Sequence, residues 1–377
     1  MAPHKLRLHR DSGVLDGGLL ARLHIDLPLL LLLVLICGLG LMILYSASGQ
    51  SAVQFERQLW RLGVAFLLML AIAQVPPLVL CRWSLPLFLL GLSLLLAVLL
   101  VGEQSKGAQR WLDLGVMRFQ PSEILKLALP MALAWYLSMR PMPPRLLDIA
   151  VAGVLIGVPV TLIAKQPDLG TALLVASAGL TTLFLSGLRW RLIIGLGVLG
   201  TAAAPVAWSL MRDYQRRRVL TFLDPASDPL GAGYHIIQSQ IAIGSGGLHG
   251  KGWLGGTQSQ LEFLPERSTD FIFAVLGEEL GLSGILLLML LYLAVILRGF
   301  DIAAQAPDAY SRLLAGSVTM VFFVYLFVNM GMVTGLLPVV GVPLPLVSYG
   351  GTSLVTLMLG FGILMSVQTR RKLLQTE

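Results

Sequence analysis

The sequence predicts an all-α polytopic membrane protein with ten transmembrane helices and one large extracytoplasmic loop between the seventh and eighth helices. The first reason is composition: of 377 residues, 56% are hydrophobic and only 12% are charged. A soluble domain carries about 25% charged residues, so this chain lacks the polar surface that water requires. Disorder is excluded too, because it needs low hydrophobicity and high charge. The second reason is that apolar runs of about 20 residues, the length of a spanning helix, recur along the chain.

The apolar runs follow one another from residue 27 to residue 367. The first lasts about 18 residues, which is longer than the apolar region of a signal peptide, and no small-residue cleavage site follows it. Nine more runs lie at 59–75, 83–101, 122–139, 146–164, 169–187, 192–211, 271–297, 313–334 and 345–367. We therefore expect a single membrane domain over 27–367, between an N-terminal tail (1–26) and a C-terminal tail (368–377).

Basic residues predict the orientation of the helices. An even number of spans places both termini on one side, where both tails and the short loops carry arginine or lysine. The loop residues are Arg82, Arg140, Arg145, Arg189, Arg191, Arg298 and Arg312. Short cytoplasmic loops are enriched in these residues, so we expect both termini in the cytoplasm.

The only long polar interval, residues 212–269, falls on the outer side although it contains three consecutive arginines at 216–218. Long loops translocate largely regardless of their charge, so the predicted orientation stands. The arginines favour an anionic ligand outside the membrane, with Arg217 as a candidate contact. Pairing with nearby aspartates or with lipid headgroups explains them equally well.

Charge, cysteine and histidine content exclude other classes of site. The formal net charge of +7 is low for a nucleic-acid binder of this size and follows the membrane ends, so we expect membrane lipids and no nucleic acid as partners. Cys37 lies in an apolar run and Cys81 beside a polar turn, which does not describe a disulfide framework or a metal cluster. The five histidines show no metal-ligand spacing.

Ionisable residues inside spans are costly, so each is a candidate functional group. The run RFQPSEILKLALP (118–130) places Glu123 and Lys126 three residues apart, on one face of a helix. The two charges neutralise each other in one interpretation. In the other, Lys126 faces a cavity and binds a phosphate while Glu123 holds it, with Arg118 as a further cation.

Two more candidates lie at the outer ends of neighbouring spans. Asp168, in AKQPDLGTALL, is either the N-terminal cap of a helix or a functional carboxylate. Trp111 and Arg110 lie in the loop KGAQRWLDLG. A tryptophan at an interface is usually a membrane anchor, but between cations it is also suited to pack on a sugar or to shield a pyrophosphate.

The strongest candidate is the acidic segment LEFLPERSTDFIFAVLGEELG (261–281). Of the 20 acidic residues in the chain, five fall here within 18 positions: Glu262, Glu266, Asp270, Glu278 and Glu279. On a continuous helix Glu278 lies about 80° from Asp270, and Glu279 lies on the opposite face. Asp270 opens the apolar run at the water boundary, where a helix cap is the alternative role because the dipole favours a carboxylate. Nearer the C-terminus, the glycines and prolines of 334–353 predict a bent or re-entrant connector packed against protein.

These stretches resemble the motifs of the SEDS family (shape, elongation, division and sporulation), and within it the members that determine rod shape. The similar stretches are LYSAS (44–48), RFQPSEILKLALP (118–130), KQPDLGTALL (165–174), RRRVLTFLDP (216–225), DPLGAGYHIIQSQIAIGSGGLHGKGWLGGTQSQLEFLPERSTDFIFAVLGEELG (228–281) and PLPLVSYGGTS (343–353). They cover nearly the whole chain from about residue 27 to residue 367.

The resemblance implies a ten-helix fold and a peptidoglycan glycosyltransferase that polymerises lipid II at the outer face of the cytoplasmic (inner) membrane during elongation and rod-shape maintenance. It implies as partner a class B penicillin-binding protein, of the penicillin-binding protein 2 type, which supplies transpeptidation. Residue by residue, the family's catalytic aspartate corresponds to Asp270, and its substrate-site residues correspond to Glu123, Lys126, Asp168 and Trp111. Relatives often carry histidine where this chain has Ser268, so a mechanism with that histidine as base has no counterpart here.

The residue types fit glycosyl transfer from a diphosphate-linked donor. An acceptor hydroxyl must lose a proton, which suits the carboxylate of Asp270, with Glu262 and Glu266 as further site candidates. The leaving pyrophosphate needs fixed cations, which Lys126, Arg110, Arg118 and the arginines at 216–218 supply. The carboxylates are compatible with a divalent cation, but no ligand spacing specifies one, so the cofactor is unknown.

Three alternatives stay open from the sequence. A transporter that flips the lipid-linked precursor would use a similar cavity, although it is expected to place charges near the membrane midplane. A scaffold for elongation or division proteins would tolerate the loss of Asp270. The division-specific member of the same family would share the activity and differ in its physiological role.

Overall fold

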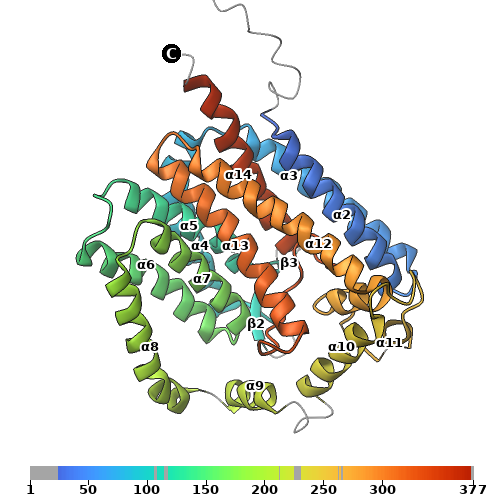
Figure 1. Ribbon diagram of the computed structural model, residues 1–377. Coiled ribbons are helices and arrows are strands. Elements are labelled where there is room, and N and C mark those ends of the chain that lie inside the picture. The colour runs from blue at the N-terminus through green and yellow to red at the C-terminus, as the bar shows by residue number, and fades with distance from the viewer. Residues whose placement is uncertain are drawn as a thin grey trace, which may run out of the picture.

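The computed structural model describes residues 24–374 except 106–107, 114–117, 212, 225–230, 262 and 265. In these residues a helix occurs at each apolar run, and the long helices other than α8 (Trp190–Leu210) lie side by side in a bundle (Figure 1). They are α2 (Leu27–Ala47), α3 (Ala52–Ala73), α4 (Pro77–Val101), α5 (Pro121–Ser138), α6 (Leu146–Lys165), α7 (Leu169–Leu185), α12 (Ile272–Ala304), α13 (Ala309–Val333) and α14 (Thr352–Leu374).

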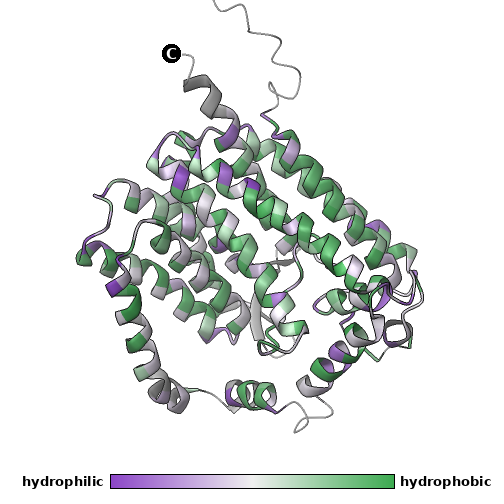
Figure 2. Ribbon diagram, viewed as in Figure 1, coloured by the Kyte–Doolittle hydropathy of each residue, from purple (hydrophilic) through white to green (hydrophobic). Residues whose placement is uncertain are grey.

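The helix surfaces are those of a polytopic membrane protein. Among the described residues, six helices are long and apolar enough to cross a membrane, namely α2, α4, α6, α12, α13 and α14. Apolar residues also cover their outward faces (Figure 2), where side chains such as Leu35 and Leu290 are more than half exposed. A bilayer accommodates such faces because its acyl chains are apolar. The count of ten spans stays a prediction.

Some helix ends differ from the predicted runs. α3 begins at Ala52 and not at 59, because the Oγ of Ser51 caps it by accepting the amide N–H of Gln54 at 3.4 Å. α14 begins at Thr352 and not at 345, because the connector of residues 335–351 contains no helix or strand. The connector is bent, as its glycines and prolines predict, and it packs its apolar side chains into the bundle core.

A small β-sheet after α4 is an addition to the predicted helices. Strands β1 (Glu103–Ser105), β2 (Ala108–Asp113) and β3 (Arg118–Phe119) pair antiparallel in the order β1-β2-β3. The strands are two to six residues long, and the sequence KGAQRWLDLG lacks the alternation of apolar residues that identifies a strand. Backbone pairing, and not side-chain pattern, therefore forms this sheet.

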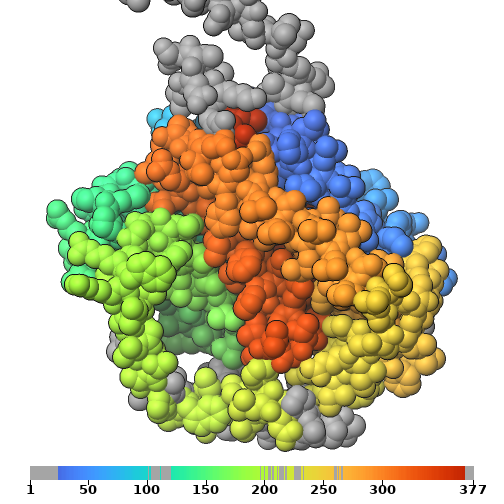
Figure 3. Space-filling view, viewed as in Figure 1, coloured from blue at the N-terminus to red at the C-terminus, as the bar shows by residue number. Residues whose placement is uncertain are grey.

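The long polar interval is partly helical, where the sequence predicted only a polar loop. It contains α9 (Asp213–Leu223), α10 (Ala232–Gly246) and α11 (Thr257–Gln260). These helices lie at the end of the bundle opposite to the C-terminal end of α14 (Figure 1). Figure 3 shows open space between the bundle and the arc that α8 and α9 form.

α12 is broken at Gly281, which has φ 65° and ψ −160°. The loop of residues 247–252 enters the break and takes over the missing helical hydrogen bonds. The N–H groups of Lys251 and Gly252 each donate at 3.0 Å to the carbonyls of Glu278 and Glu279, and those of Leu282 and Ser283 donate at 2.9 and 3.1 Å to the carbonyls of Gly247 and Leu248. A broken helix is tolerated in a membrane protein when its backbone groups find such partners. The predicted continuous run 271–297 is therefore wrong on this point.

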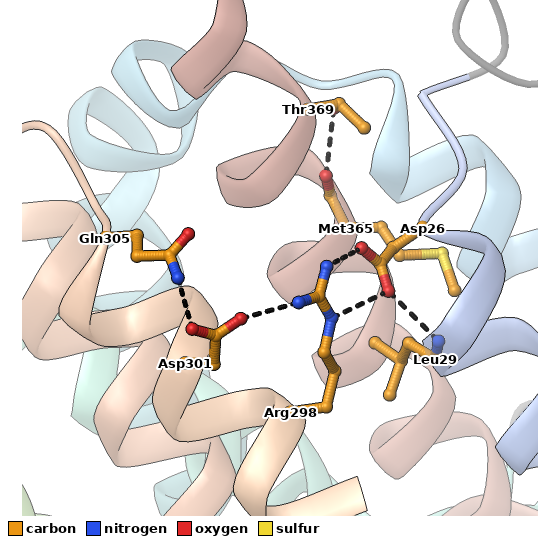
Figure 4. Close-up of polar contacts among 7 residues, drawn as sticks. All are labelled: Asp26, Leu29, Arg298, Asp301, Gln305, Met365 and Thr369. Atoms are coloured by element: carbon orange, nitrogen blue, oxygen red, sulfur yellow. Dashed lines mark hydrogen bonds and ion pairs between the residues drawn. The ribbon is translucent and has the colours of Figure 1, made fainter.

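The far end of α12 is attached to the beginning of α2 (Figure 4). Arg298 donates from Nε to Oδ1 of Asp26 at 3.2 Å and from Nη2 to Oδ2 at 2.5 Å, and from Nη1 to Asp301 at 2.5 Å. Asp26 also caps α2 by accepting the N–H of Leu29 at 3.0 Å. α2 and α12 pack together. The segment that precedes α12, which contains Asp270, therefore lies at the opposite end of the bundle from Asp26.

The substitution Gly281→Ala is expected to destabilise the protein. A non-glycine residue in this backbone conformation costs about 1–3 kcal/mol, and an added Cβ would lie 2.3 Å from the backbone nitrogen of Gly250. Gly153→Ala in α6 is the matched control, because a Cβ there meets nothing within 4 Å. We expect a lower Tm in detergent for Gly281→Ala alone. Equal values for the two variants would contradict the packing of the loop into the break.

Candidate active site

A cavity of about 440 Å³ brings together five of the predicted site residues. They are Glu123, Lys126, Asp168, Trp111 and Asp270. Trp111 reaches the cavity from β2, while the connector contributes residues 339–343. Side chains that are distant in the sequence thus converge on one volume.

Four helices begin at this cavity. Its lining includes residues at or next to the N-termini of α5, α7, α12 and α14, namely Gln120, Asp168, Asp270 and Thr352. Helix N-termini carry partial positive charge and unpaired N–H groups, which favour anions. The site is therefore electrostatically suited to carboxylates and to an anionic ligand.

Glu123 and Lys126 form a buried ion pair on α5. The Lys126 Nζ lies 2.7 Å from the Glu123 Oε1, and the two residues are only 3% and 6% exposed. The Lys126 ammonium also lies 5.1 Å from the ring centroid of Tyr325. The two charges thus neutralise each other, which was the first interpretation of the sequence. Both residues also line the cavity, which the second interpretation, phosphate binding by Lys126, requires.

Asp168 is the N-cap of α7. Its Oδ1 accepts the N–H of Thr171 at 3.2 Å, and its Oδ2 accepts the side-chain amide of Gln120 at 3.3 Å. The capping role predicted as an alternative is confirmed. The carboxylate lies on the cavity wall as well, so its role toward a substrate stays a prediction.

Asp270 is held through its backbone. Its carbonyl accepts the side-chain amide of Asn329 at 2.9 Å, and the same amide donates to the carbonyl of Val342 at 2.7 Å. The helix cap is Phe271, without a side-chain cap bond, so the alternative of Asp270 as the N-cap is wrong. Gly341 of the connector has φ 70°, a backbone conformation that favours glycine, and an added Cβ there would make an ordinary contact of 3.4 Å with the Asp270 Oδ2.

The two residues before Asp270 are fixed by the same connector. The carbonyl of Ser268 accepts the N–H of Tyr349 at 2.8 Å, and the carbonyl of Thr269 accepts the Ser348 hydroxyl at 2.5 Å. Ser268 therefore contributes its backbone here. The segment that carries Asp270 is held at three consecutive carbonyls, two by the connector and the third by Asn329 of α13.

Glu266, Glu278 and Glu279 are not among the residues that line the cavity. Glu266 is exposed and accepts the Thr269 hydroxyl at 3.0 Å, and its role toward a substrate stays a prediction. Glu278 binds Lys251 at 2.7 Å and the N–H of Thr257 at 2.8 Å. Glu279 accepts the Ser46 hydroxyl. Glu278 thus holds the loop that precedes Asp270, and Glu279 joins the first part of α12 to α2.

The side chains of the remaining predicted residues lie outside the described part of the structure. Glu262 lies outside the described residues, as do the side chains of Arg110 in β2, Arg118 in β3 and Arg217 in α9. Within the described part of the chain, no three His, Cys, Asp or Glu side chains are grouped to hold a metal ion.

Sequence reasoning missed Tyr325 and Asn329. Both lie on α13, four residues apart and so on one face, and Tyr325 lines the cavity while Asn329 holds Asp270. The available signal was their polarity inside the apolar run 313–334. An amide and a neutral phenol cost less to bury than a charged carboxylate or ammonium, so these two residues did not stand out from the apolar run.

The chain matches a known family along most of its length. Residues 26–373 match the FtsW, RodA and SpoVE family of cell cycle proteins. The chain belongs to this family. It is the SEDS family that the motifs indicated, and the resemblance drawn from the sequence is confirmed.

Curated relatives of the SEDS family align over nearly the whole chain. The peptidoglycan glycosyltransferase MrdB of Escherichia coli K12 is 56% identical over 354 residues, which cover 94% of this chain and 96% of MrdB. The probable peptidoglycan glycosyltransferase FtsW of Geobacter metallireducens is 38% identical, covering 92% of this chain and 95% of that protein.

Solved SEDS structures share the fold. The rod shape determining protein RodA of Thermus thermophilus superposes with a TM-score of 0.70 at 32% identity, covering 92% of this chain and 97% of RodA. A chain from a peptidoglycan synthase complex that coordinates polymerization and crosslinking superposes with a TM-score of 0.81 at 38% identity, covering 92% of this chain and 98% of that chain.

The double variant Glu123→Ala/Lys126→Ala separates the two roles of the ion pair. Removing one partner of a buried pair costs about 3–5 kcal/mol, because the other charge stays unpaired, so both single variants should melt lower. The double variant should regain stability and yet stay inactive, because the cavity has lost Lys126. Thermal melting and glycan synthesis from lipid II provide the two measurements. Recovery of activity together with stability would make the pair purely structural.

Proposed function

We propose that this protein is a peptidoglycan glycosyltransferase that polymerises lipid II at the outer face of the cytoplasmic membrane during elongation and maintenance of rod shape. The observation that carries the proposal is the cavity in which Asp270, the Glu123–Lys126 pair, Asp168 and Trp111 meet. The name and the 56% identity of MrdB support it, as does the similarity to RodA. Asp270 supplies a base on one wall of the cavity, and Lys126 supplies a cation on another, beside several helix N-termini.

In the proposed reaction, a sugar hydroxyl attacks the anomeric carbon of the diphosphate-linked donor. The hydroxyl proton passes to the Asp270 carboxylate as the new C–O bond forms, a general-base contribution of ~10²–10⁴-fold. The bond between the anomeric carbon and the diphosphate breaks, and the diphosphate leaves with the electron pair. Lys126 stabilises the charge that grows on this group, because a fixed cation in a buried site needs no reorganisation.

The position of the cavity favours an enzyme over a flippase. Its charged residues belong to the first two turns of α5, to the N-cap of α7 or to the segment before α12, and so lie near one end of the bundle. A transporter of lipid-linked precursors is expected to bind its cargo near the midplane. An edge position suits a reaction between headgroups while the lipid tails remain in the bilayer.

The same proposal includes the topology and the partner. Ten helices span the membrane, both termini are cytoplasmic, and residues 212–269 form the extracytoplasmic loop. A class B penicillin-binding protein of the penicillin-binding protein 2 type crosslinks the strands. The similarity to a chain of a complex that coordinates polymerization and crosslinking supports this partner.

The topology is tested by labelling single cysteines with a membrane-impermeant reagent. Ser227→Cys should react in intact cells, because it lies in the extracytoplasmic loop. Gln305→Cys, between α12 and α13, should react only after permeabilisation, and the unmodified chain gives the background from Cys37 and Cys81. Labelling of Ser227→Cys only after lysis would contradict both the orientation and the external active site.

Asp270→Asn should lower the polymerisation rate about 100-fold or more, because the amide cannot accept the hydroxyl proton. Tm should stay close to wild type, since the bonds that hold this segment use the backbone carbonyls. Asp308→Asn is the matched control, because Asp308 is the N-cap of α13 at the opposite end of the bundle and asparagine caps equally well. Folded Asp270→Asn protein that polymerises purified lipid II at the wild-type rate would refute the role of Asp270.

A further inference from the structure

Tyr325 is a residue of the cavity wall whose hydroxyl proton has no acceptor among the described residues. It is 1% exposed, it lies on α13, and its ring faces the ammonium of Lys126 at 5.1 Å. Buried polar groups in native proteins are almost always hydrogen-bonded, so each exception calls for a cause.

Two other buried tyrosines have hydroxyls that form hydrogen bonds inside the bundle. The Tyr292 hydroxyl donates to the carbonyl of Pro345 at 2.7 Å. The Tyr310 hydroxyl lies 2.9 Å from the Ser84 hydroxyl, at the other end of α13. Tyr325 differs because it lines the cavity beside Lys126 and its hydroxyl proton has no acceptor among the described residues. A partner for its proton is therefore most readily supplied from the cavity.

We propose that Tyr325 is a further substrate-binding residue, whose hydroxyl donates a hydrogen bond to an anionic diphosphate oxygen of the lipid-linked substrate held at Lys126. The inference rests on the proposed function and adds a residue to that site. The chemistry of the surroundings identifies the ligand atom. A hydroxyl proton, an ammonium and the N-terminus of α14 at Thr352 all favour an oxygen with negative charge.

The hydroxyl keeps its proton throughout the reaction. As the bond from the anomeric carbon to the diphosphate breaks, charge grows on the diphosphate oxygens, and the bond from Tyr325 strengthens. The contact therefore contributes both to binding of the diphosphate and to its departure. The aromatic ring has a separate role, since it shields the ammonium of Lys126 from the apolar core.

Tyr325→Phe tests the inference because it removes the hydroxyl and keeps the ring over Lys126. Binding of undecaprenyl diphosphate, and of undecaprenol without phosphate, is measured on purified protein. We expect diphosphate affinity to fall about 10–100-fold, the effect typical of a hydrogen bond to a charged group, and undecaprenol binding to stay unchanged. The kcat for lipid II polymerisation should fall by a similar factor. Tyr310→Phe, which removes a buried hydroxyl far from the cavity, should alter only the Tm.

The outcomes are distinguishable from one another. Wild-type diphosphate affinity in Tyr325→Phe overturns the inference, whether or not the protein polymerises lipid II. An equal loss of affinity in Tyr310→Phe overturns it too, because the effect would then come from packing. If Tyr325→Phe and Glu123→Gln lower the Tm equally and leave affinity unchanged, the hydroxyl serves Glu123 instead. Wild-type protein that binds the diphosphate but makes no glycan overturns the proposed function alone.

Discussion

The position of the candidate active site depends on the side-chain amide of Asn329. This one group donates to the carbonyls of Asp270 and Val342, and so joins α13, the connector and the segment before α12. Three segments of the chain thus meet at a single nitrogen. The connector and the segment before α12 lack regular backbone hydrogen bonds at that point, whereas α13 is helical there. In an apolar surrounding an unpaired carbonyl is costly, so the amide supplies both stability and geometry.

The short first part of α12 is held at both ends by irregular backbone. At its beginning, the connector and Asn329 bind the carbonyls of residues 268–270. At its end, the loop 247–252 fills the break at Gly281 and places Lys251 against the buried Glu278. The pair Asp26–Arg298 then anchors the long second part at the opposite end of the bundle. Asp270 thus precedes a helical segment that is fixed at both ends, which suits the proposed reaction between two large lipid-linked substrates.

Local signals made the helices and the charged residues of the cavity predictable from the sequence. Apolar length identified the runs, and the cost of burying charge singled out Lys126, Asp168 and Asp270. The break at Gly281 and the three short strands were not predictable, because both depend on backbone partners that come from distant loops. The same limitation explains why Glu278 and Glu279 were grouped with Asp270. Proximity in sequence suggested one acidic site, but the fold directs these glutamates to the loop and the aspartate to the cavity.

Backbone and side chain have separate tasks in the segment that carries Asp270. Ser268, Thr269 and Asp270 are each fixed through a main-chain carbonyl, so no bond of this set consumes the carboxylate. The opposite holds for Glu123 and Asp168, whose carboxylates are engaged by Lys126 and by a helix N-terminus. The main-chain carbonyls of residues 268–270 thus set the position of Asp270, whereas Glu123 and Asp168 are also held through their side chains.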